Sequence, residues 1–197
     1  MSDSDLALSI ALGIGLAAAT GFRVFLPMLS TSAAAYSGHL PLGENFAWLG
    51  TAPALAMLGV AAVVEIFAYY IPGVDNLLDT LATPAAFVAG TIVSAAVMTD
   101  VSPMLKWTTA IIAGGGIAGH TQDVTALLRA KSTMFTAGVG NPVVATAELG
   151  GSLLVSLLAL AAPIIALLAV GAFLWFAVRL IRKITRRARP ANTEASG

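Results

Sequence analysis

The stretch that decides the fold lies near the carboxyl end, where residues 142–181 read PVVATAELGGSLLVSLLALAAPIIALLAVGAFLWFAVRLI. Glu148, Pro163 and Arg179 are the main interruptions of its apolar character. As one α-helix it would be about 60 Å long, which is about twice the thickness of the hydrocarbon core of a bilayer. We therefore expect two membrane spans that fold back near residues 161–163. One long kinked helix that leaves the membrane is the alternative.

Composition extends this expectation to the whole chain. Of its 197 residues, 58% are hydrophobic and 10% are charged, with a mean hydropathy of +0.89. A soluble domain carries about 25% charged residues, so we expect an all-α, polytopic transmembrane helix bundle. Residues 1–185 would form its single transmembrane domain. The chain has no cysteine, which excludes disulfides and thiolate metal sites.

Further apolar stretches supply the other spans, since about 20 apolar residues cross a bilayer. They cover residues 6–29, 51–71, 84–98 and 104–124. With the two spans of the quoted stretch the total is six, or five if that stretch is one helix. The acidic start MSDSDLALSI lacks the basic segment of a cleaved signal peptide, so the first span is expected to remain.

An internal repeat favours the six-span arrangement. Residues 11–38 resemble residues 111–138, and the following span repeats at an offset of 91, which aligns Pro72 with Pro163. Two halves of three spans each would be inverted relative to one another, as in many transporters. This arrangement predicts that both termini are cytoplasmic.

Basic residues are concentrated after the last apolar stretch. Six of the ten lie between Arg179 and Arg189, which predicts a cytoplasmic carboxyl end. Residues 186–197 are expected to form a basic, then disordered, cytoplasmic tail. Its partners would be the lipid bilayer and anionic lipid headgroups, not nucleic acid. A homo-oligomer is an open alternative.

Charged residues within or next to the apolar stretches mark the candidate site, because charge in the bilayer is costly unless it faces protein or water. Depth estimated from the helical rise brings four of them to the cytoplasmic half. These four are Glu65, His120, Asp123 and Glu148. Arg23 is expected to stand apart near the outer interface. Asp75, Asn76, Asp79 and Arg129 are assigned to an interfacial loop region, with Asp75 as the N-cap of a short helical turn.

Small residues at four-residue spacing predict close helix contacts. Gly13, Ala17 and Gly21 form one such series, and Gly115 and Gly119 form another. The triple glycine at 114–116 is expected either to pack closely or to unwind its span locally.

Several of these residues together resemble a known family. They are GFRVFLP (21–27), Glu65, IPGVDNLLD (71–79), Gly119-His120, Arg129, Ser132, Asn141-Pro142, Glu148 and Ala162-Pro163. The set is similar to a bacterial membrane-protein family called domain of unknown function 4126, over roughly residues 6–185. The resemblance implies a multi-pass protein of the bacterial cytoplasmic (inner) membrane and no known activity. Relatives tend to carry a charged pair just before the Ile-Pro, where this chain has AYY (68–70), and Ile-Arg-Pro where it has ATP (82–84). Basic partners for Asp75 and Asp79 are therefore missing at these positions.

The pattern of buried charge favours transport or permeation of a small solute or a lipid headgroup. Proton coupling through Glu65 and Glu148, with His120 and Asp123 as relay, is one form of this hypothesis. The first alternative is an accessory membrane protein that binds a partner or lipid without moving anything. The second is an intramembrane enzyme, which lacks an evident nucleophile or metal. We expect no enzyme activity, no cofactor and no metal.

Overall fold

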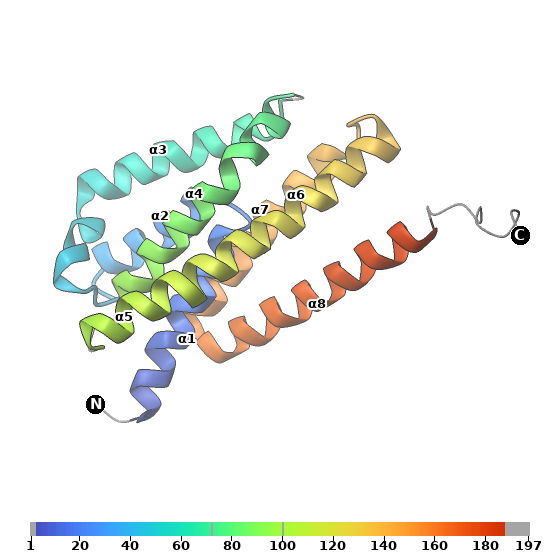
Figure 1. The fold of residues 1–197 in the computed structure, drawn as a ribbon. Coiled ribbons are helices and arrows are strands. Elements are labelled where there is room, and N and C mark those ends of the chain that lie inside the picture. Colours follow the sequence, from blue (N-terminus) through green and yellow to red (C-terminus); the bar gives the residue numbers. More distant parts are fainter. Residues whose placement is uncertain (1–2, 72, 100, 188–197) are drawn as a thin grey trace, which may run out of the picture.

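The computed structural model describes residues 3–71, 73–99 and 101–187. Over these residues it is an all-α bundle without strands, in which long helices lie side by side (Figure 1). The helices are α1 (Asp3–Thr20), α2 (Phe25–Tyr36), α3 (Ala52–Ala68), α4 (Val74–Val97), α5 (Pro103–Thr109), α6 (Gly116–Thr136), α7 (Asn141–Ala161) and α8 (Pro163–Arg187). A 3₁₀ segment η1 (Glu44–Gly50) precedes α3, and a π-helical segment η2 (Ala110–Gly115) joins α5 to α6. The tail after residue 187 and the side chain of Asn76 lie outside the described part.

The quoted apolar stretch forms two helices, as expected. Helix α7 ends at Ala161 and α8 begins at Pro163, where proline fits the first helical turn. A Cβ on Gly15 of α1 would lie 3.1 Å from Ala159 and 3.4 Å from Ala166, so both helices meet α1 at one level. The alternative of one long kinked helix is therefore wrong.

Among the described residues, three helices are long and apolar enough to cross a membrane, over Leu77–Val97, Asn141–Ala161 and Pro163–Lys183. A fourth is added if η1 and α3, which are bent by 66°, count as one span. Six spans and two inverted halves are not confirmed by these helices.

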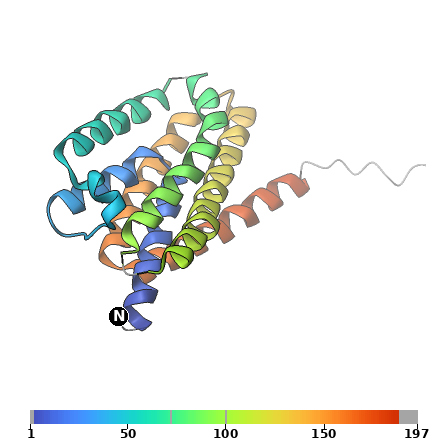
Figure 2. The same ribbon diagram turned by 60° about the vertical axis from the view of Figure 1, so that its left-hand side comes forward.

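The first expected span, residues 6–29, is not one continuous helix. Helix α1 runs along α4, with Gly13 beside Ser94 and the Thr20 hydroxyl 3.4 Å from the Ala86 carbonyl to which it donates. The chain then turns at residues 21–24, and α2 returns along α3. Pro27 accounts for the break, because it has no N–H to bond the carbonyl four residues earlier and its ring clashes there. Residues 3–36 therefore form a helical hairpin whose turn lies inside the bundle (Figures 1 and 2).

Helix α4 also differs from the sequence prediction. The expected short turn at 74–79 and the expected span at 84–98 are one helix of 24 residues with Pro84 inside it. Its N-cap is Gly73, with a φ of 88° that favours glycine, and Asp75 lies in the first turn. Asp75 is therefore not the N-cap.

The triple glycine packs closely, as one of the two expectations had it, and the span remains helical instead of unwinding. The helix departs locally into the π-helical segment η2 (Ala110–Gly115), and the glycines allow close contact with α4. A Cβ on Gly115 would lie 2.4 Å from Thr91 Oγ1, and one on Gly114 would lie 2.6 Å from Ser94 Cβ. The backbones of η2 and α4 can approach one another only because these side chains are absent.

Candidate functional site

The buried charges gather in one cluster, which we call the charged core. Its members come from five places in the chain, and they are Arg23, Tyr69, Asp79, Arg129 and Glu148. Arg23 and Arg129 are each 1% exposed, and Glu148 is 4% exposed. Because these side chains are remote in sequence, the core ties the α1–α2 turn to α4, α6 and α7.

Arg23 lies in the turn between α1 and α2 and points toward α7. Its Nη2 donates to the Ala145 carbonyl at 2.8 Å, and its Nη1 lies 3.5 Å from Glu148 Oε2. Arg23 was expected to lie near the outer interface, apart from the other charged residues. That expectation is wrong, because Arg23 lies beside Glu148. The reason is the helical hairpin, which carries the residue back into the bundle instead of onward to the far surface.

Arg129 lies near the middle of α6 and joins two carboxylates. Its Nη2 donates to Glu148 Oε2, and its Nε lies 3.2 Å from Asp79 Oδ2. Asp79 therefore has its basic partner on α6, and not in the segments at 68–70 and 82–84. Arg129 was expected in an interfacial loop, but α6 extends to Thr136 and buries it.

Tyr69 is the member that sequence reasoning missed. The guanidinium carbons of Arg23 and Arg129 lie 3.9 Å and 4.3 Å from the centroid of its ring, within the range of cation–π attraction. Its hydroxyl also hydrogen-bonds to Asp79. A lone tyrosine at a helix end gave no signal for this role.

Formal charge balances within the core, since two arginines face two carboxylates. The hydrogen-bond donors and acceptors of these side chains are not all paired. Within the described part of the protein, Arg129 Nη1, Arg23 Nε, Glu148 Oε1 and Asp79 Oδ1 are buried without a hydrogen bond. Buried polar atoms of this kind call for a specific explanation, such as water or a ligand. The core can therefore offer both donors and acceptors to a small polar molecule.

Glu65 lies beside the charged core and stabilises the start of α2. Its carboxylate accepts hydrogen bonds from the backbone N–H groups of Val24, at 2.7 Å, and Phe25, at 3.0 Å. These N–H groups open α2 and would otherwise have no partner inside the bundle. A negative charge there also suits the positive end of the helix dipole. Glu65 thus caps the returning arm of the hairpin, beside the charged core.

His120 and Asp123 are not brought to the glutamates. Both are exposed, and they line a shallow hollow of about 550 Å³ with Thr83, whose hydroxyl donates to Asp123 Oδ1 at 2.9 Å. The cause is helical phase, because Asp123 and Arg129 are six residues apart and point in directions about 120° apart around α6. The expected convergence of Glu65, His120, Asp123 and Glu148 therefore does not occur. No three metal-binding side chains gather among the described residues.

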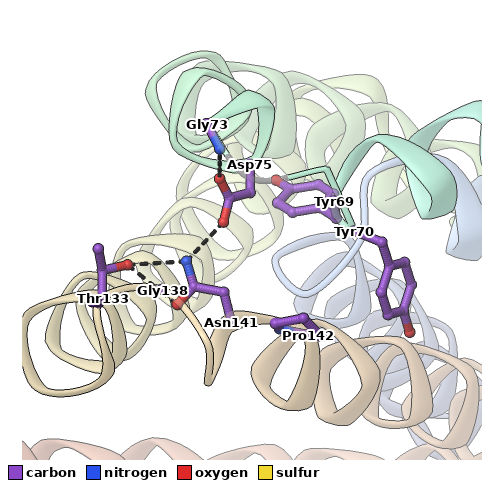
Figure 3. Close-up of a pocket in the computed structure, with 9 residues that line it drawn as sticks. Tyr69, Tyr70, Gly73, Asp75, Thr133, Gly138, Asn141 and Pro142 are labelled. Atoms are coloured by element: carbon purple, nitrogen blue, oxygen red, sulfur yellow. Dashed lines mark hydrogen bonds between the residues drawn. The ribbon is translucent and has the colours of Figure 1, made fainter.

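A polar pocket of about 150 Å³ adjoins the core at Tyr69 (Figure 3). Asp75 of α4 and Asn141 of α7 meet across it, with Asn141 Nδ2 donating to Asp75 Oδ2 at 2.7 Å. Asp75 Oδ1 accepts from the N–H of Gly73 at 2.9 Å, and Asn141 also bonds Thr133. Asp75 was expected in an interfacial loop, but it is 2% exposed. Asn141 carried a signal only as part of the Asn141-Pro142 pair.

Comparison with known proteins agrees with the resemblance. Residues 10–183 match the family described as "Domain of unknown function (DUF4126)". No curated protein and no solved structure matches the chain. The matched region contains the whole charged core, the Glu65 cap and the polar pocket. Because the match covers most of its length, the chain belongs to the DUF4126 family.

Proposed function

We propose that the chain crosses the membrane five times, through α3, α4, the α5–α6 run, α7 and α8. In this topology α1 and α2 enter and leave at one face. Helix α8 runs parallel to α1, since Ala166 lies beside Gly15 and the rings of Phe173 and Phe22 are 4.9 Å apart. The start of α1 and the end of α8 therefore lie at opposite ends of the bundle (Figure 1).

Charge supports a cytoplasmic location for the end at which α6 and α8 finish. Among the described side chains, Lys131, Arg179, Arg182 and Lys183 lie toward that end, whereas Lys106 lies in α5. This distribution follows the positive-inside rule. It places the amino terminus outside, in contrast to the six-span hypothesis.

Reporter fusions test the topology. We expect green fluorescent protein to be fluorescent when fused after Gly197, and alkaline phosphatase to be active when fused before Met1. A matched pair of fusions in the loop after Tyr36 should report the outer face as well. Two cytoplasmic termini would contradict the five-crossing topology and restore six spans.

For the activity, we propose that the protein moves a small polar solute across the membrane. The observation that carries this proposal is the hairpin turn, which brings broken backbone and Arg23 beside Ala145 and Glu148 in the middle of the bundle. Irregular backbone at membrane depth is tolerated where it lines protein or a wet cavity, and transporters build substrate sites at such helix breaks.

The charged core would act as the element that switches. Glu148 Oε2 lies near both Arg23 and Arg129. A solute with its own donor and acceptor could therefore replace Glu148 at one arginine while Glu148 stays bound to the other. Tyr69 separates the core from the polar pocket, which is the proposed entry from the cytoplasmic side. The class of solute that fits is therefore zwitterionic or neutral and polar, rather than a bare ion.

Electrophysiology on proteoliposomes tests this proposal. Amino acids, small amines, small carboxylates and polyols would be applied to membranes on a solid support, at two pH values to detect proton coupling. For electroneutral solutes, uptake of labelled solute replaces the current. We expect at least one zwitterionic or polar class to give transport that Glu148→Gln reduces by about tenfold or more, since each 1.4 kcal/mol is a factor of ten.

The matched control is Asp123→Asn, which removes an exposed carboxylate on α6 and should leave transport unchanged. Variants would first be checked for folding by their elution from a sizing column. Equal transport by wild type and Glu148→Gln, or none for any class, would contradict the proposal.

One observation favours a second candidate, the accessory protein that moves nothing. Glu65 and Glu148 both have protein partners, so the charges already have a structural use in holding the hairpin. In that case none of the solute classes would be transported, and Glu148→Gln would change stability alone.

A further inference from the structure

A second cavity lies away from the polar pocket, between α3 and α4. It has a volume of about 540 Å³, and we call it the apolar groove. Helix α3 packs mainly against α2 and η1, and it lies to one side of the bundle in both ribbon views (Figures 1 and 2). The groove is lined by Val24, Phe25, Met57, Val60, Ala61, Val64, Glu65, Ala68, Tyr69, Leu78, Leu81, Ala82 and Ala85.

The chemistry of the lining selects an apolar ligand. Glu65 is the charged residue of the lining, and its carboxylate is turned to the N–H groups of Val24 and Phe25. The remaining wall is aliphatic or aromatic, apart from the hydroxyl of Tyr69. Met57 is 69% exposed and Val60 is 66% exposed, so the groove opens sideways along α3. In a bilayer that opening faces lipid tails.

Size distinguishes a lipid tail from a partner helix. One turn of an α-helix, about 10 Å across and 5.4 Å high, occupies about 400 Å³. The groove therefore has room for little more than a single turn, so a helix of a second copy could insert side chains into it but not its backbone. A flexible acyl chain can fill the same volume along its length.

We propose that the apolar groove binds one acyl chain of a phospholipid from the cytoplasmic leaflet. The groove reaches Ala68 and Tyr69 at the end of α3, which is the end of the bundle that carries the partly exposed Lys131, so the headgroup would lie there. The chain fills the gap between α3 and α4 and shields the Glu65 cap from the bilayer. This site does not depend on transport, because it uses a different cavity.

Native mass spectrometry tests the site. The full chain would be taken from nanodiscs of phosphatidylethanolamine and phosphatidylglycerol into mild detergent, and the lipids retained per chain would be counted. Ala61→Phe fills the groove from α3, whereas Ala56→Phe adds the same ring on the same helix outside the lining. A ring that displaces two methylenes should reduce retention by about tenfold or more, because each buried methylene contributes about fourfold.

We expect wild type and Ala56→Phe to retain a single lipid, and Ala61→Phe to lose it. Added lipid should raise the melting temperature of the first two proteins and not that of the third. If Ala61→Phe does not fold, Ala85→Phe fills the groove from α4 instead. Equal retention by all variants would overturn the site, as would a wild type that retains no lipid. A dimer without bound lipid would show that a second copy covers the groove.

Discussion

We expect Arg129→Gln to lower the free energy of unfolding by about 3–5 kcal/mol, which is the usual cost of removing one partner from a buried ion pair. Arg129 is 1% exposed and bridges Asp79 and Glu148, so the variant leaves two carboxylates in the core with Arg23 alone as a cation. Glutamine retains some hydrogen bonding but no charge. Thermal unfolding in detergent would show the loss, at about 2–4 °C for each kcal/mol in a chain of this size.

The control for this prediction is Lys131→Gln, which removes the same charge two residues away on α6 at a partly exposed position. Its melting temperature should stay close to that of the wild type. The double variant Arg129→Gln with Glu148→Gln should recover part of the stability, because it removes the unpaired carboxylate together with the arginine. A single variant as stable as Lys131→Gln would mean that the charged core does not hold the bundle together.

The sequence was sufficient for the features that depend on local pattern. The apolar run at 142–181 and its proline predicted the turn at residues 161–163, and the triple glycine predicted close packing against another helix. Both features act over a few residues, through the length of a span or the absence of a side chain. The charged residues within apolar stretches also identified Arg23 and Glu148 as important positions.

The position of the site could not be predicted, because it depends on one break in a helix. The first apolar stretch, residues 6–29, is long enough to span, and Pro27 looked compatible with its end. In the structure Pro27 instead lies in the first turn of α2, the chain reverses at 21–24, and Arg23 reaches Glu148. Depth estimates that assumed straight spans therefore misplaced Arg23.

Helical phase explains the second miss. The sequence analysis estimated the depth of His120 and Asp123, but depth along a helix does not specify direction around it. Arg129, six residues beyond Asp123, is the charged side chain among the buried residues of α6. Tyr69 was overlooked for a different reason. Its role depends on contacts between its ring and two arginines from remote parts of the chain.

The second large effect concerns packing between η2 and α4. We expect Gly115→Leu to lower the free energy of unfolding by about 3 kcal/mol or more, at the upper end of the range for overpacked interiors. Even a single Cβ at this position would lie 2.4 Å from Thr91 Oγ1 and 3.0 Å from the Phe87 carbonyl oxygen. The carbonyl belongs to the backbone of α4 and cannot turn aside as a side chain can.

The adjacent residue, Gly116, provides a closely matched control. A Cβ on Gly116 would meet nothing within 4 Å, so Gly116→Leu adds the same side chain to the same helical run without a clash. Leucine is a better helix former than glycine by about 0.8–1 kcal/mol, so this variant should melt at or above the wild-type temperature. Both variants gain that propensity equally, and the difference between their melting temperatures therefore measures the contact with α4. If Gly115→Leu and Gly116→Leu melt at the same temperature, the π-helical segment η2 faces lipid. The close approach of η2 to α4 would then not be the contact that fixes the position of α6 and its Arg129.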